Sequence, residues 1–244
     1  MNKAYLKGLR HGLPIALGYV SVAFAFGIQA CGVGMTPLQT VMISFFNVTS
    51  AGQLAGLQLM ASGAGLAEMA LMQLTINLRY ALMSLSLSQK LDSSMTLPHR
   101  LLISFCNTDE VFVVASQQPG KLGKAYLYGL TNGPFLGWVL GTALGALAGG
   151  ILPADVTQAL GIAIYGMFIA IVAPPFRRSR EVRAVVLIAV GMSCAMTFLP
   201  LLGFVSEGFR IILCAVFASA LGAWLMPRPV REEPIARGVK EELV

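Results

Sequence analysis

Charged residues are scarce in this sequence, and their absence from long stretches argues against a soluble fold. Only 11% of the 244 residues are Asp, Glu, Lys or Arg, whereas a soluble domain carries about 25%. None of the four types occurs between Arg10 and Glu68. That interval is long enough for two membrane helices, since each needs about 20 apolar residues. The sequence therefore predicts an all-α, polytopic transmembrane helix bundle embedded in a lipid bilayer.

Histidine and cysteine are also sparse, which argues against a metal site or a disulfide framework. The two histidines are His11 and His99, and no two of the four cysteines form a CxxC pair. A nucleotide-binding GxxxxGK[ST] loop, an HExxH motif and a GxSxG motif are all missing. We therefore expect neither an enzyme nor a bound cofactor.

The basic residues are clustered and do not form a stripe. The formal net charge is +6, and eleven of the seventeen Lys and Arg residues lie in three groups beside apolar runs. These groups are Lys3/Lys7/Arg10, Arg177/Arg178/Arg180/Arg183 and Arg228/Arg231/Arg237/Lys240. Such flanking clusters are typical of the positive-inside bias of membrane proteins. Nucleic-acid binding would need a continuous basic face on a soluble fold, so we exclude it.

Hydropathy predicts one transmembrane domain over residues 1–226 and a polar, disordered cytoplasmic tail over 227–244. The predicted spans are 13–30, 38–60, 66–87, 101–116, 125–147, 156–174, 184–202 and 209–226. The fourth is short and carries two acids, so we expect it to be tilted, broken or re-entrant. Eight crossings put both chain ends in the cytoplasm but leave Lys90 and Arg100 facing outward. Seven crossings separate the ends.

A weak similarity between two stretches of the sequence indicates an internal repeat. His11-Gly12-Leu13 followed by Pro37 recurs as Tyr128-Gly129-Leu130 followed by Pro153, at an offset of about 116 residues. Transporters are often built from such repeats, frequently with broken helices at the substrate site.

The second predicted span contains a polar segment, Asn47-Val48-Thr49-Ser50-Ala51-Gly52-Gln53. On a continuous helix, Thr49 and Ser50 share a face with Gln53 because they precede it by four and three residues. Amides and hydroxyls in hydrocarbon need hydrogen-bond partners. Two interpretations stay open. The segment is either a small-residue packing seam or a broken helix whose side chains, Asn47 included, hold a zwitterionic substrate.

The third and fourth spans carry charge. Arg79 follows Asn77 in an apolar run, where an arginine costs roughly 3 kcal/mol on insertion scales. It either snorkels, pairs structurally with an acid, or binds a substrate carboxylate, and intramembrane charge favours a function. Asp109 and Glu110 point about 100° apart on a helix. One of them is expected to pair with Arg79 and the other to take up a proton, unless both cap the segment at the water interface.

The chain resembles the AzlC family, the large subunit of bacterial branched-chain amino acid exporters of the LIV-E type. The similar pieces lie in order within residues 12–224. They are Ala23-Phe24-Ala25-Phe26-Gly27, the small-residue run ending in Gln53, Asn77-Leu78-Arg79 and Asn107-Thr108-Asp109-Glu110-Val111-Phe112. The run before Gln53 departs from the family pattern, small-Gly-small-Ser-Gln, because here the glycine directly precedes the glutamine.

This resemblance implies a multi-pass protein of the bacterial inner membrane that exports valine, leucine, isoleucine and methionine by secondary transport. It also implies a partner, a much smaller multi-span subunit of the AzlD type. We expect export to be proton-coupled. Asn47, Thr49, Ser50 and Gln53 would line the site, Asn77 and Arg79 would contact the substrate carboxylate, and Asp109 or Glu110 would carry the proton. The alternatives are a passive channel or permease for other small solutes, and a non-transporting scaffold subunit.

Overall fold

The structure, a computed structural model, describes residues 2–149, 172–198 and 205–226, with residues 155, 166 and 169 singly. Its described part is helical apart from one isolated bridge between Leu91 and Leu122, which agrees with the predicted all-α class. The helices are α1 (Lys3–Gly32), α2 (Pro37–Phe46), α3 (Ser50–Ala61), α4 (Leu66–Ser88), α5 (Leu97–Phe105), α6 (Asp109–Ser116), α7 (Lys124–Ala148), α9 (Arg180–Phe198) and α10 (Glu207–Leu225). The predicted tail 227–244 and most of the predicted span 156–174 lie outside the described residues.

Three of the described helices are long and apolar enough to cross a bilayer by composition: Lys3–Gly32, Arg180–Phe198 and Gly208–Leu225. Helices α4 and α7 are long as well, with 23 and 25 residues, or about 35 and 38 Å at 1.5 Å per residue. The other four are short. They have 10, 12, 9 and 8 residues, which is about half of a 30 Å hydrocarbon core.

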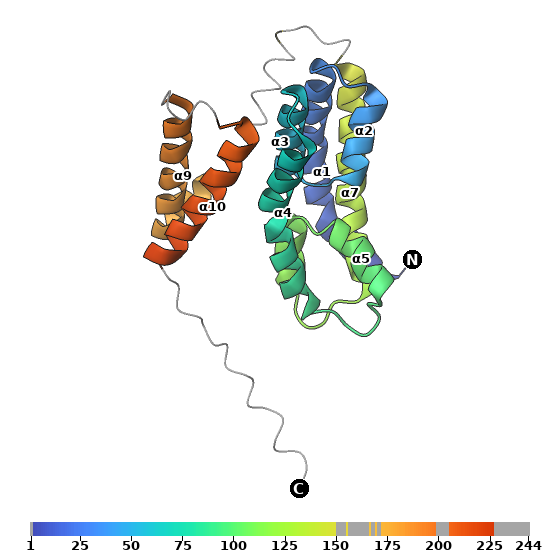
Figure 1. The fold of residues 1–244 in the computed structure, drawn as a ribbon. Helices are drawn as coiled ribbons and strands as arrows, with labels where there is room; N and C mark the ends of the chain where they lie inside the picture. Colours follow the sequence, from blue (N-terminus) through green and yellow to red (C-terminus); the bar gives the residue numbers. More distant parts are fainter. Residues whose placement is uncertain are drawn as a thin grey trace.

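Helices α1 and α7 form the central pair and run parallel (Figure 1). Small residues let their backbones touch along the whole contact. A Cβ atom at Gly8 would lie 2.1 Å from the Tyr126 carbonyl oxygen, and one at Gly145 would lie 2.0 Å from that of Phe24. This seam is the small-residue packing common in membrane bundles, where close backbone approach replaces hydrophobic burial.

Helices α2 and α3 form the first hairpin, which enters the bundle and returns to the end it came from. Thr36 and Gln39 form a capping box that starts α2 beside the end of α1. At the break between the helices, Val48 packs with Ala23 in the middle of α1. Leu57 of α3 then packs with Ala30, back near the end of α1.

Helices α5 and α6 form the second hairpin, which enters from the opposite end. His99 of α5 is 2.9 Å from the Tyr128 hydroxyl at the start of α7. The ring of Phe105, at the end of α5, meets that of Phe135 in the middle of α7. Helix α6 ends at Ser116, at the same end of the bundle at which α5 begins. There the Ser116 carbonyl accepts a hydrogen bond from Lys90 Nζ at 2.6 Å.

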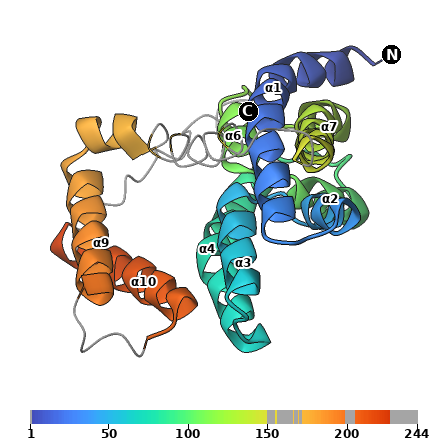
Figure 2. The same ribbon diagram turned by 90° about the horizontal axis from the view of Figure 1, so that it is seen from above.

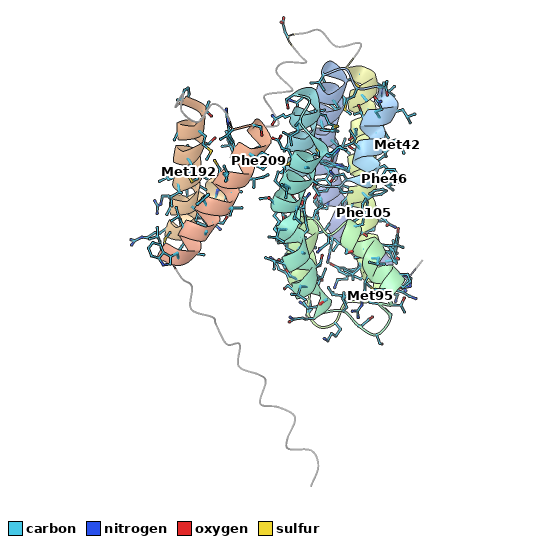
Figure 3. The ribbon with its side chains drawn as sticks, in the orientation of Figure 1. Met42, Phe46, Met95, Phe105, Met192 and Phe209 are labelled. Atoms are coloured by element: carbon cyan, nitrogen blue, oxygen red, sulfur yellow. The ribbon has the colours of Figure 1, made fainter. Side chains whose placement is uncertain are left out.

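The breaks of the two hairpins, residues 47–49 and 106–108, lie at a similar height of the bundle, both near Phe135 of α7. Phe135 of α7 contacts Phe45 of α2, with ring centroids 5.5 Å apart, and Phe105 of α5 at 6.3 Å. Figure 3 shows Phe46 and Phe105 at neighbouring levels, with Met42 above them and Met95 at the lower end. A long helix followed by a hairpin thus occurs twice, in opposite directions.

One topology prediction needs correction. Residues 38–60 do not form one continuous helix, because α2 and α3 are half-length helices that turn back at an extended break. The fourth segment is likewise broken, at residues 106–108, as one of the expected alternatives had it; a substrate held at either break stays a prediction. Hydropathy missed the reversal because both halves of the hairpin are equally apolar. The sequence similarity at an offset of about 116 residues relates α1 to its neighbour α7, and an internal repeat stays a prediction, as does the count of seven or eight segments.

One end of the bundle collects positive charge. Every Lys and Arg of residues 2–149 except Arg79 lies at the end where α1 and α7 begin, which we call the basic end: Lys3, Lys7, Arg10, Lys90, Arg100, Lys121 and Lys124. The opposite end carries only Glu68 among the charged residues of that range. The expectation that Lys90 and Arg100 face away from Lys3 is therefore wrong, because the first hairpin does not cross.

Helices α9 and α10 form an antiparallel pair beside α3 and α4 (Figure 2). Glu68, in the first turn of α4, accepts from the Gly208 backbone N–H at 2.9 Å and from the Ser206 hydroxyl. Ile211 and Ile212 then pack against the cluster formed by α3 and α4. Glu68 thus satisfies the N-terminus of α10 and holds it on the bundle.

Candidate functional site

An ion pair joins the middle of α4 to the start of α6. Arg79 Nη1 donates to Asp109 Oδ2, and Arg79 Nη2 donates to the Tyr80 hydroxyl at 3.2 Å. The side chains of Arg79 and Asp109 are 45% and 40% exposed. Arg79 lies in the middle of α4, and Asp109 lies at the break of the second hairpin. The ion pair is therefore partway along the bundle and not in a loop at either end. We call Arg79, Asp109, Glu110 and Tyr19 the central site.

Glu110 faces α1 instead of α4. Its Oε2 accepts a hydrogen bond from the Tyr19 hydroxyl, which also lies 2.7 Å from Thr108 Oγ1. Both acids occupy the first turn of α6, where the helix dipole favours negative charge. Thr108 is the N-cap residue by position but makes no side-chain capping bond. Of the alternatives drawn from the sequence, the pairing of one acid with Arg79 is correct.

Charge is unbalanced in the central site when all of its groups are ionised. Arg79 supplies one positive charge, whereas Asp109 and Glu110 supply two negative ones. Unpaired charge inside a membrane bundle is costly. The site therefore favours an additional positive charge, which either a proton or a ligand ammonium group can supply.

Gln53 belongs to a separate, closed set of hydrogen bonds that we call the amide network. Its Nε2 donates to Ser44 Oγ at 2.7 Å, and its Oε1 accepts from Trp138 Nε1 at 2.8 Å. Ser44 Oγ lies 2.7 Å from Thr142 Oγ1, and both of these residues are fully buried. The amide network ties α2, α3 and α7 together and leaves Gln53 only 2% exposed.

Thr49 and Asn77 surround the first turn of α3. Thr49 Oγ1 donates to Asn47 Oδ1 at 2.8 Å and does not cap the helix. Gln73 of α4 donates to the Gly52 carbonyl at 2.8 Å and accepts from Asn77 Nδ2 at 2.9 Å. The Asn77 Oδ1 atom is buried and has no hydrogen-bond partner in the described part of the chain.

The predicted site residues thus fall into separate groups. Arg79, Asp109 and Glu110 lie together. Asn47, Thr49 and Asn77 gather at the α3 N-terminus, where Ser50 is the first helical residue. Asn77 and Arg79 are two residues apart on α4, so they project about 200° apart. One carboxylate lying against Arg79 is therefore not also held by Asn77 in this arrangement.

Several residues at these sites were not predicted from the sequence. Tyr19 contacts Glu110 across 91 positions, and Trp138 contacts Gln53 across 85. The rings of Tyr19 and Trp138 meet edge to face, with centroids 5.3 Å apart, and so connect the central site to the amide network. One feature of the sequence could have indicated them. Tyr19 and Trp138 are aromatic residues with a hydroxyl or N–H group inside apolar runs, and such a group needs a hydrogen-bond partner when it is buried.

Comparison with known proteins identifies relatives along most of the chain. The family profile described as "AzlC protein" matches residues 14–152. An "Uncharacterized membrane protein" of Archaeoglobus fulgidus is 34% identical over 222 residues, covering 90% of this chain and 94% of that protein. The "Inner membrane protein YgaZ" of Escherichia coli K12 is 29% identical over 188 residues, 74% of this chain and 76% of that protein. No solved structure matches.

The profile covers both hairpins, the Arg79–Asp109 pair and all of α7, and the archaeal relative extends the similarity to 90% of the chain. The resemblance drawn from the sequence motifs is thereby confirmed. This membrane protein belongs to the AzlC family.

Proposed function

We propose that this protein is a proton-coupled secondary exporter of branched-chain amino acids (valine, leucine and isoleucine, with methionine as a further substrate) in a bacterial inner membrane. One observation carries the proposal. The Arg79–Asp109 ion pair lies at the break of the second hairpin, and Phe135 of α7 contacts residues beside the breaks of both oppositely directed hairpins. Broken helices with charged groups near mid-membrane are typical of substrate and coupling-ion sites in secondary transporters.

The proposed mechanism is an exchange of partners at Arg79. A planar guanidinium binds any carboxylate well, so the substrate carboxylate competes with Asp109 for the same donors. The surplus negative charge of Asp109 and Glu110 attracts the substrate ammonium group. When the substrate leaves, a proton takes its place, and this alternation couples the two fluxes.

The α3 N-terminus offers a second set of donors. Thr49 leaves its first turn without a side-chain cap, and orphan N–H groups at a helix start attract anions. The unpartnered Asn77 Oδ1 nearby is an acceptor for an ammonium group. We propose that the substrate moves between this position and Arg79 as α4 or the second hairpin shifts.

The basic end is the cytoplasmic side in this proposal, following the positive-inside bias. The exposed apolar side chains of α4, such as Leu74, Leu78 and Leu82, are 57–65% exposed and need cover. Lipid and a small multi-span subunit of the AzlD type are the proposed cover.

Arg79→Ala tests the function directly. In proteoliposomes, wild-type protein should exchange labelled valine for unlabelled valine in a saturable way, which a passive channel does not do. Arg79→Ala should lower this exchange at least about 100-fold, because a charge-assisted bidentate contact is lost. The matched control is Arg210→Ala, an arginine of α10 that donates to the Val205 carbonyl. Unchanged exchange in the inserted Arg79→Ala protein would refute the mechanism, and a scaffold subunit predicts no exchange from any variant.

A further inference from the structure

A cavity of about 140 Å³ lies between the basic-end half of α4 and the second hairpin. Its lining includes Ser84, Leu87, Leu91, Met95, Ile103 and Asn107. Met95, which is labelled at the lower end of the bundle in Figure 3, marks its outer part. Asn107 closes the inner part, two residues before Asp109. The cavity therefore extends from the basic end toward the central site.

The walls of this cavity are mainly apolar and well packed. Leu87, Met95 and Ile103 are at most 5% exposed and belong to one core cluster with residues of α6 and α7. An apolar cavity of about 150 Å³ accommodates a molecule the size of benzene. A leucine, isoleucine or valine side chain has fewer carbon atoms than benzene and is of the size that this space accommodates, whereas an indole is larger than benzene.

One polar group at the inner end lacks a partner. Asn107 is 2% exposed, and its Nδ2 donates to Ser84 Oγ at 3.0 Å. Its Oδ1 accepts nothing from the described residues. Buried acceptors normally accept at least one hydrogen bond, so a donor from outside the described residues is expected at this atom. Asn107 lines the cavity, so an ammonium group bound there is close enough to supply that donor.

The outer rim carries a positive charge. Arg100 lines the cavity and donates its Nε to the Met95 carbonyl at 2.9 Å. Its terminal nitrogens make no other hydrogen bond or ion pair within the part of the chain that the structure describes. A fixed guanidinium at the mouth of an apolar cavity raises the local concentration of carboxylates, including that of a free amino acid.

We propose that this cavity is a loading site, distinct from the central site, that takes a branched aliphatic amino acid from the basic end. The aliphatic side chain occupies the apolar walls, the ammonium group binds Asn107 Oδ1, and Arg100 draws in the carboxylate. The inference rests on the proposed export function, and it assigns the selection of aliphatic side chains to this cavity rather than to Arg79.

A diazirine analogue of leucine, cross-linked to the full chain and mapped by mass spectrometry, tests the loading site. Labelling should fall on residues 84–107 and should be displaced by leucine, but not by tryptophan. Ser88→Leu narrows the cavity and should reduce this labelling about tenfold or more, the scale of a misfitted methylene group. Ser86→Leu is the matched control, because Ser86 is on the same helix, is exposed and does not line the cavity.

Each outcome decides between explanations. Displaceable labelling lost in Ser88→Leu and kept in Ser86→Leu supports the loading site. Labelling around Arg79 and Asp109 alone overturns it while leaving export intact. Labelling of residues 84–107 that a fatty acid displaces and leucine does not would identify a lipid site and also overturn it. If wild-type protein exchanges valine yet Ser88→Leu leaves the preference for leucine over tryptophan unchanged, side-chain selection occurs elsewhere and the proposal fails.

Discussion

Both hairpins consist of two half-length helices joined at an extended break, but the polar groups near the two breaks differ in burial and charge. In the first, Gln53 has both ends of its amide bonded inside the amide network, and Ser44 and Thr142 are fully buried. In the second, Asp109 and Arg79 pair while each remains 40% exposed or more. A closed network of satisfied bonds fixes its helices. The partial exposure of the Arg79–Asp109 pair leaves both groups accessible to another charged partner.

In the proposed mechanism, the first hairpin is the fixed wall, held to α7 through the hydrogen bond of Trp138 to Gln53, and the second is the exchanging element, held to α4 by the Arg79–Asp109 pair. Tyr19 connects the two hairpins, because its hydroxyl contacts Glu110 and its ring meets that of Trp138 edge to face.

The largest expected effect is on cysteine labelling, which reports the side of the membrane from which each hairpin enters and should be all-or-none. Both ends of the first hairpin should be reached by a membrane-impermeant maleimide from outside intact cells, and both ends of the second only after permeabilisation. Single cysteines at Val33 and Ser62 test the first, and at Ser93 and Gln117 the second. The background lacks the native cysteines Cys31, Cys106, Cys194 and Cys214.

If either hairpin were a single crossing, the two members of its pair would label from opposite sides. Each pair thus serves as the control for the other. Labelling of Val33 and Ser62 from opposite sides would also contradict the placement of the two breaks at a similar height of the bundle.

Local physics accounts for most of what the sequence predicted. The charge-free interval after Arg10 required membrane helices, and Arg79 required an acid, for which the chain offers few choices at comparable depth. These features are local in the chain or follow from the cost of charge in hydrocarbon.

What escaped prediction depends on where distant segments meet. Gln53 resembles a ligand in the sequence because its partners Ser44 and Trp138 lie 9 and 85 positions away, and no spacing rule links them. The reversal at residues 47–49 leaves no mark in hydropathy, since a half-length helix pair and one full helix contain the same residues. Tertiary packing decides between them.

Gln53→Leu tests the fixed wall. The change leaves the buried Trp138 N–H without its acceptor and removes one of the two hydrogen bonds of Ser44 Oγ, which keeps Thr142. This should cost about 1–3 kcal/mol in the free energy of unfolding. Chemical denaturation of the detergent-solubilised protein measures it. Gln58→Leu on the exposed side of α3 is the matched control and should change stability by less than about 0.5 kcal/mol. Equal stability of the two variants would contradict a structural role for the network and return Gln53 to the substrate site.

Glu110→Gln tests the exchanging element and has the smallest expected effect on the fold. The amide oxygen of glutamine still accepts from Tyr19, so the geometry persists while the titrating group is removed. An imposed gradient, acidic on the outer side, should accelerate wild-type valine efflux about tenfold, equivalent to about 1.4 kcal/mol. The Glu110→Gln protein should lose this acceleration yet retain valine exchange, which needs no net proton movement. Asp109→Asn is the matched comparison: if that variant alone loses the acceleration, Asp109 carries the proton, and if both variants keep it, the second hairpin does not couple transport to protons.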